Sequence, residues 1–292
     1  FFRTFDKSMD KYKKHIMGDA SEEPMPLYII PDRKVSLADV REGMRNHYEG
    51  TELSMTNDPG AGAYKVPYRW RPMTFKSEGR EYFNERAIAT QQTGFVLIAQ
   101  MRSWLPDAVG GILWFGVDDA NTAVLTPMYA SITEIPECYR RGNGSMTEFS
   151  WTSAFWIHNW VANMAYNRYE PMIRDIRPVQ KELEDSYVDL VKNTDAKALE
   201  LLKSSPAQAT AYLTEVCGKV ANEATARWKK LGEYLLVKYM DGNVKKEKDG
   251  KFEENGYGQI VSPNFPGYSQ EYYDQVAKSE EAKHLEVPKK DK

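Results

Sequence analysis

The order in which strand-like and helix-like segments follow one another is the strongest constraint on the fold of this chain. Stretches rich in β-branched and aromatic residues occupy residues 86–104, 110–119 and 122–133, and short Pro-Asp, Gly-Gly and Asp-Asp-Ala-Asn runs separate them. These separations predict three antiparallel strands joined by short turns. Helical patterns follow only after the strands. This order predicts an α+β fold, in which helices cover one face of an antiparallel sheet.

The predicted helices make up most of the second half of the chain. Residues 149–169 repeat bulky apolar side chains at three- and four-residue steps, which is typical of a buried helix. Residues 178–203 and 205–240 continue the helical pattern. Ser205 followed by Pro206 is a typical helix start, because serine caps the first turn and proline fits its first position.

The segments on either side of this region have less regular patterns. Residues 1–34 are polar and contain several prolines, so we expect a connection in which residues 27–30 are extended or form an isolated strand. A helix capped by Ser36 and ended by Gly50 should follow. Residues 56–73 mix glycine, proline and aromatic residues, which favours an ordered loop.

Polar composition also defines the end of the chain. Residues 241–292 are rich in Lys, Glu, Gly and Tyr with little apolar periodicity, which predicts an extended tail. We therefore divide the chain into a connecting segment (1–34), a globular part with its helices (35–240) and a polar tail (241–292).

Composition excludes several classes of function. The formal net charge of −3 argues against a nucleic-acid-binding surface, which needs clustered excess Lys and Arg. No stretch approaches the roughly 20 apolar residues of a membrane span. Cys138 and Cys217 have no zinc-like spacing, and nothing else in the sequence calls for a metal or a cofactor.

Two local patterns have a structural and a functional interpretation. Asp118, Asp119 and Asn121 are residue types that bind calcium, but the twelve-residue loop that would complete such a site is lacking, so a tight turn with Asx hydrogen bonds is favoured. An aromatic cluster resembles a sugar-stacking platform, yet its helical spacing favours a place in the core. This cluster consists of Trp151, Phe155, Trp156 and Trp160.

Four segments carry a resemblance to a known family. They are HYEGTELSMTND (47–58), PYRWRPMTF (67–75), the run over residues 82–132, and IPECYRRGNGSMTEFSWTSAFWIHNWVANMAYNRY (135–169). This chain resembles the PepD-type cysteine dipeptidases of the N-terminal nucleophile (Ntn) hydrolase superfamily. The resemblance implies a four-layer αββα sandwich, to which residues 35–240 would contribute the C-terminal part. It also implies hydrolysis of dipeptides.

In this family an N-terminal Cys thiolate attacks the scissile carbonyl, and the α-amino group of the same residue is the base. The reference pKa of an α-amino group is about 7.7 to 8.0, close to working pH. Our chain begins with Phe1, so we expect the nucleophile to lie upstream, in a segment missing from this chain. We then expect the fragment alone to be inactive, and one face of its sheet to stay apolar where that segment packs. The resemblance leaves open homo-oligomerisation and a cytoplasmic or periplasmic location.

Arg102 is the main candidate site residue. It follows an apolar strand, where its guanidinium would emerge between sheet and loop and bind a dipeptide carboxylate or stabilise the tetrahedral intermediate. The alternative is a structural ion pair with Asp107, Asp118 or Asp119. Asn84 and Gln92 are candidates for substrate binding, although ordinary buried hydrogen bonding is the favoured explanation for both.

The sequence is compatible with two other functions. Cys138 lies near Arg140 and Arg141, which would favour its thiolate, and it would form a self-contained cysteine hydrolase if the fold brings a histidine to it. A non-enzymatic aromatic-rich binding module is the other alternative.

Overall fold

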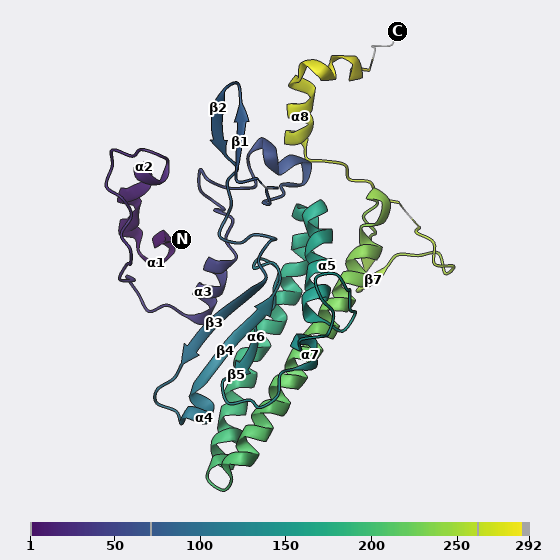
Figure 1. Ribbon diagram of the computed structural model, residues 1–292. Coiled ribbons are helices and arrows are strands. Elements are labelled where there is room, and N and C mark those ends of the chain that lie inside the picture. Colours follow the sequence, from purple (N-terminus) through teal and green to yellow (C-terminus); the bar gives the residue numbers. More distant parts are fainter. Residues whose placement is uncertain (1, 71, 262, 288–292) are drawn as a thin grey trace.

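A three-stranded antiparallel sheet lies against three long helices in the computed structural model, which describes residues 2–70, 72–261 and 263–287 (Figure 1). The strand order is β3-β4-β5, with β3 at Phe95–Met101, β4 at Gly111–Val117 and β5 at Thr126–Tyr129. Phe95 pairs with Val117, and Met101 pairs with Gly111. The predicted antiparallel strands are confirmed, and the chain has an α+β fold.

The helical layer consists of α5 (Ala154–Asn167), α6 (Tyr169–Leu202) and α7 (Pro206–Lys238). Ser205 caps α7 by accepting a hydrogen bond from the backbone N–H of Gln208 at 3.3 Å, as its sequence predicts. α6 and α7 form an antiparallel pair that extends beyond the end of the sheet (Figure 1). The core lies between this layer and one face of the sheet. Its largest fully buried members include Ile112, Trp114, Leu125, Ile157, Leu213 and Trp228.

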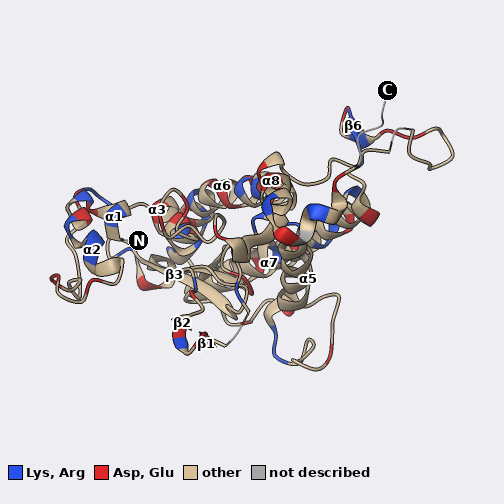
Figure 2. Ribbon diagram, turned by 90° about the horizontal axis from the view of Figure 1, so that it is seen from above, with Lys and Arg blue, Asp and Glu red and all other residues tan. Residues whose placement is uncertain are grey.

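The other face of the sheet is apolar and uncovered by the described residues. Alternation along β3 and β4 points Val96 and Trp114 into the core, whereas Phe95, Leu97 and Leu113 are 60%, 42% and 40% exposed on the opposite face. Neither strand contains a charged residue, and β3 is drawn without charges in Figure 2. The expectation of one bare apolar face is confirmed.

Short elements precede and connect the strands. They are α1 (Phe2–Phe5), η1 (Lys7–Tyr12), α2 (Lys13–Ile16), α3 (Leu37–Met44), η2 (Pro59–Tyr64), the hairpin of β1 (Thr74–Ser77) and β2 (Arg80–Phe83), α4 (Asp107–Gly110) and η3 (Glu137–Tyr139). The N-terminal segment is therefore not a plain connection, although residues 27–30 have no regular structure. Ser36 and Asp39 form a capping box at α3, so the predicted start is confirmed.

The end of α3 and the tail depart from prediction. α3 ends at Met44, well before Gly50, because the chain then enters a turn with a left-handed residue, Tyr48 (φ 63°). The tail has η4 (Met240–Gly242), a hairpin of β6 (Glu247–Lys248) and β7 (Lys251–Phe252), α8 (Gln270–Lys278) and η5 (Glu280–Leu285). An entirely extended tail is therefore wrong. Ser269 caps α8, and the Tyr268 ring packs edge-on against Tyr64 at 5.3 Å.

None of the described helices is both long and apolar enough to cross a membrane.

Candidate functional site

The turn between β4 and β5 forms the first half of the site. Asp119 is fully buried, and its Oδ2 accepts hydrogen bonds from the backbone N–H of Thr122 at 3.0 Å and from the Thr122 hydroxyl at 2.9 Å. This is the Asx turn that the sequence favours over a calcium loop. Asp118, next to it, has a positive φ of 68°, which is uncommon for a residue with a side chain. A strained residue of this kind is typical of sites where the surrounding structure imposes the conformation.

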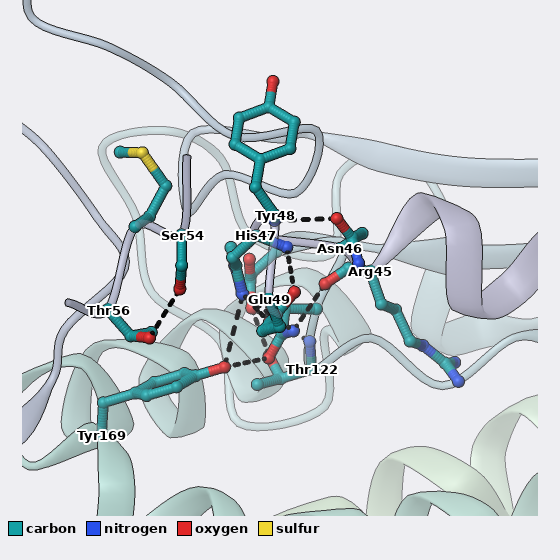
Figure 3. A network of polar contacts seen from close by, with 12 residues as sticks. Arg45, Asn46, His47, Tyr48, Glu49, Ser54, Thr56, Thr122 and Tyr169 are labelled. Atoms are coloured by element: carbon teal, nitrogen blue, oxygen red, sulfur yellow. Dashed lines mark hydrogen bonds and ion pairs between the residues drawn. The ribbon is translucent and has the colours of Figure 1, made fainter. Parts of the chain in front are cut away.

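A second strained turn follows α3 and forms the other half of the site (Figure 3). The left-handed residue Tyr48 stands between His47, which is buried, and Glu49, which is half exposed. Glu49 Oε2 accepts a hydrogen bond from the His47 backbone N–H at 2.6 Å, and Glu49 Oε1 lies 3.1 Å from His47 Nδ1. A proton on Nδ1 satisfies this contact, and the buried Nε2 then has no partner among the described residues.

Asn121 and two tyrosines join the two turns. Asn121 Nδ2 donates to the Arg45 carbonyl at 2.8 Å, and its Oδ1 accepts from the Tyr169 hydroxyl at 3.1 Å. The Tyr166 hydroxyl donates to Asp119 Oδ1 at 3.0 Å. Tyr166 lies on α5 and Tyr169 begins α6, so the junction of these helices fixes the geometry of both turns.

Burial sets the protonation of the site. It raises the pKa of Asp118 to about 7, because the cost of burying the charge outweighs the hydrogen bonds from the Asn159 amide, 2.8 Å from Oδ1, and from the Asp119 backbone. Burial also raises the pKa of Tyr169, which therefore stays a hydrogen-bond donor. Burial alone would raise the pKa of Glu49 too, but hydrogen bonds from His47 and from backbone N–H groups outweigh it and lower that pKa. Glu49 is therefore a fixed negative charge.

An open groove of about 740 Å³ lies beside the second turn. Its residues are Glu49 and Thr56 on one side, and Tyr169, Ile173, Arg174, Arg177, Pro178 and Lys181 of α6 on the other. Figure 3 shows the Thr56 and Tyr169 side chains beside the His47 turn.

Arg102 lies at the opposite end of the sheet from Asp118. The seven residues of β3 separate the two ends by about 20 Å. The guanidinium forms a two-pronged ion pair with Asp195 of α6 and donates to the carbonyls of Val109 and Gly110. The partner is thus an aspartate, but none of the three that the sequence suggested.

The other two predicted site residues precede β3, and Gln92 lies at the same end of the sheet as Asp118, whose backbone N–H donates to the Gly94 carbonyl at 2.9 Å. Asn84 closes the base of the β1/β2 hairpin, where its Nδ2 donates to the carbonyl of Pro72 at 2.8 Å and to that of Trp70. Gln92 Oε1 accepts from the Thr90 hydroxyl at 3.3 Å. Arg102, Asn84 and Gln92 therefore do not form one site in this structure, and their roles stay predictions.

Sequence reasoning missed His47, Glu49 and Tyr169 as members of a site. His47 fits the apolar face of the helix predicted after Ser36, so the periodicity assigned it to packing. A signal was present in the Glu two residues later, because a buried histidine needs a polar partner. Tyr169 is 122 residues away from His47, and no local pattern connects them.

Both cysteines are free and buried. Burial raises the pKa of the Cys138 thiol and raises that of Cys217 to about 11. The expected help from Arg140 is absent, since its guanidinium pairs with Glu137 at 3.0 Å. A raised pKa disfavours the thiolate that a nucleophile needs. Within the described part of the chain, no group of three or more His, Cys, Asp or Glu residues could hold a metal ion.

Comparison with known proteins identifies the family. The model of peptidase family C69 matches residues 4–182, which include both strained turns and the groove. The chain belongs to peptidase family C69. It is 26% identical over 233 residues to a probable dipeptidase B of Lactococcus lactis subsp. lactis, covering 77% of this chain and 44% of that protein. A probable dipeptidase of Latilactobacillus sakei is 26% identical over 220 residues, covering 73% and 41%.

A third relative, dipeptidase A of Lactobacillus helveticus, is 22% identical over 172 residues, covering 58% of this chain and 30% of that protein. The chain thus spans less than half the length of these relatives. Their names confirm the resemblance to a dipeptidase family.

Proposed function

We propose that this chain is the C-terminal part of a dipeptidase whose nucleophile is an N-terminal Cys outside these 292 residues. The observation that carries the activity is membership of peptidase family C69, together with relatives named as dipeptidases. The cysteine chemistry of this chain supports the location of the nucleophile elsewhere. Cys138 and Cys217 are buried, and burial raises the pKa of both thiols.

The proposed reaction is acyl transfer through a thioester. The α-amino group of the N-terminal Cys takes the thiol proton, and the thiolate sulfur bonds to the scissile carbonyl carbon. When the tetrahedral intermediate collapses, the C–N bond breaks and the leaving amine receives the proton from the α-ammonium group. Water then attacks the thioester, which frees the N-terminal residue of the dipeptide as an amino acid and restores the thiol.

The bare apolar face of the sheet supports an αββα sandwich for the whole protein. Helices α5, α6 and α7 cover one face of β3, β4 and β5, which is the order of one helical layer and one sheet. In a sandwich the second sheet packs face to face with the first at about 10 Å. Phe95, Leu97 and Leu113 would then enter the contact between the sheets.

The test is to compare this chain with the product of the complete gene. We expect the complete protein to hydrolyse dipeptides, and iodoacetamide to abolish turnover by alkylating one N-terminal Cys, which peptide mass spectrometry locates. The purified 292-residue chain should release no amino acid. Turnover by the chain alone that is lost in Cys138→Ser would overturn the proposal and favour the self-contained cysteine hydrolase.

A further inference from the structure

The groove beside the His47 turn carries charged groups that the proposed reaction does not use. Arg174, Arg177 and Lys181 lie three and four residues apart, so they lie along one side of α6. At a rise of 1.5 Å per residue, Arg174 and Lys181 are about 10 Å apart along the helix. Glu49 lines the same groove from the strained turn.

Two of these cations can exchange their present partners for a ligand. Arg174 pairs with Glu170 at 2.9 Å, and Lys181 pairs with Asp185, and both cationic side chains are more than 70% exposed. Ion pairs exposed to this degree contribute only about 0 to 1 kcal/mol, so an anion in the groove can compete for them. Arg177 differs because it is already engaged, donating to the Asn121 carbonyl at 2.8 Å and to Gln180 Oε1 at 2.7 Å.

Acceptors for a positive group lie in the same groove. Glu49 is held by two contacts to His47, and its carboxylate is still half exposed. Pro178 has no backbone N–H, so the carbonyl of Arg174 receives no helical hydrogen bond from it. Ile173, Pro178 and the Tyr169 ring supply apolar contact area between the charges.

These features match a small molecule with one negative end, one positive end and an apolar middle. The two termini of an extended two-residue peptide are about 7 Å apart, and the groove offers a carboxylate and two exposed cations to receive them. We propose that the groove binds the free dipeptide, with its carboxylate at Arg174 and Lys181 and its ammonium group at Glu49. That the ligand is a dipeptide rests on the proposed dipeptidase function, whereas its two opposite charges are inferred from the residues of the groove.

Binding can be measured on this chain without turnover. Isothermal titration with leucyl-leucine, its C-terminal amide and its N-acetyl form compares the contribution of each terminus. We expect both blocked forms to bind at least about tenfold more weakly, since a charged hydrogen-bonded contact contributes about 1.5 to 3 kcal/mol. The double variant R174Q/K181Q should bind leucyl-leucine more weakly, and it should bind leucyl-leucine and its C-terminal amide with equal affinity.

The matched control is Lys192→Gln, which removes another exposed, ion-paired cation of α6. It should bind all three ligands as the unsubstituted chain does. Absence of saturable binding, or a preference for the acid that survives in R174Q/K181Q, would overturn the groove as the binding site.

Kinetics of the complete protein separate this proposal from the proposed function. R174Q/K181Q should raise KM about tenfold and leave kcat nearly unchanged, because these contacts contribute to substrate binding. Dipeptide turnover with an unchanged KM in this variant would contradict the groove and leave the function intact. Charge-selective binding without any turnover would support the groove and contradict the function.

Discussion

Arg102 places a fixed positive charge between the end of β3 and α6, where its side chain is only 7% exposed. Asp195 and the carbonyls of Val109 and Gly110 take its donors, and its guanidinium lies 5.9 Å from the centre of the Tyr129 ring. Arg102→Lys keeps the charge but loses the planar fork. From these contacts we expect the free energy of unfolding to fall by roughly 1 to 3 kcal/mol, because buried carbonyls lose their donors.

Urea unfolding followed by circular dichroism measures this change. Arg227→Lys is the control, since Arg227 is 45% exposed and its pair with Glu182 is long, at 3.9 Å. That variant should unfold like the original chain. If Arg102→Lys leaves stability unchanged while it lowers dipeptidase activity of the complete protein, the role in substrate or transition-state binding holds instead.

Asp118 gives the stability of the chain a pH dependence of known sign. Its pKa is about 7 in the folded state, against a reference value of 3.8, because the side chain is buried. The folded state therefore binds the proton more tightly, so the Asp118 contribution to stability falls as pH rises from about 4 to 7. Each pKa unit corresponds to about 1.4 kcal/mol, which sets an upper bound on the order of 4 kcal/mol.

Asp118→Asn removes this titration. The Asn side chain can still accept the Asn159 hydrogen bond and tolerates a positive φ. We expect the variant to exceed the original chain in stability by more at pH 8 than at pH 4.5, with unfolding free energies from urea titrations at both values. An equal difference at the two pH values would show that Asp118 does not titrate in this range.

At the level of elements, the packing of α5 against α7 depends on one glycine. A Cβ at Gly232 would come within 2.4 Å of the Trp160 ring, whereas a Cβ at Gly218 on the same helix meets no atom within 4 Å. Glycine to alanine in a helix interior normally stabilises by about 1 kcal/mol. We therefore expect Gly218→Ala to raise the melting temperature, and Gly232→Ala to lower it because overpacking costs about 1 to 3 kcal/mol.

Differential scanning calorimetry of the two variants distinguishes packing from helix propensity. Stabilisation by both substitutions would mean that Trp160 moves aside without cost, so that α5 and α7 are not fitted tightly at this point.

The sequence predicts the elements that depend on residues close together in the chain. Periodicity placed α5, α6, α7 and the three strands, and the Ser36 and Ser205 caps act through neighbours three residues away. The Asx turn at Asp119 is local in the same way. Glu49 and Tyr169 joined the candidate site only in the folded chain, because the contacts that join the two strained turns span tens of residues. Gln92 and Arg102 lay on one predicted strand over residues 86–104, but β3 covers only Phe95–Met101, so both lie outside it and at its opposite ends.

At the level of the whole molecule, helices cover only one face of the sheet among the described residues. β3 is an edge strand without charges, and the face of Leu97 and Leu113 carries none either. Uncharged edges and exposed apolar patches above a few hundred Å² are uncommon in monomeric proteins, because both promote association. In the proposed αββα sandwich the second sheet would bury this face, which accounts for a strand composition that suits an interior better than a surface.

The bare apolar face should make the chain alone prone to association. The chain alone should bind the dye ANS and associate as its concentration rises, and Leu97→Glu with Leu113→Glu should reduce both effects, since two charges on neighbouring strands make burial of the face costly. Both side chains are about 40% exposed, so the fold itself should keep its melting temperature. Leu236→Glu is the control, because Leu236 is an exposed leucine of α7, away from the sheet. Sedimentation velocity and ANS fluorescence measure the effects.

In the complete protein the paired substitution should also abolish assembly of the active enzyme, whereas Leu236→Glu should not. A chain that stays monomeric and binds no dye, with full activity in the doubly substituted complete protein, would mean that this face is an ordinary surface and that no second sheet covers it.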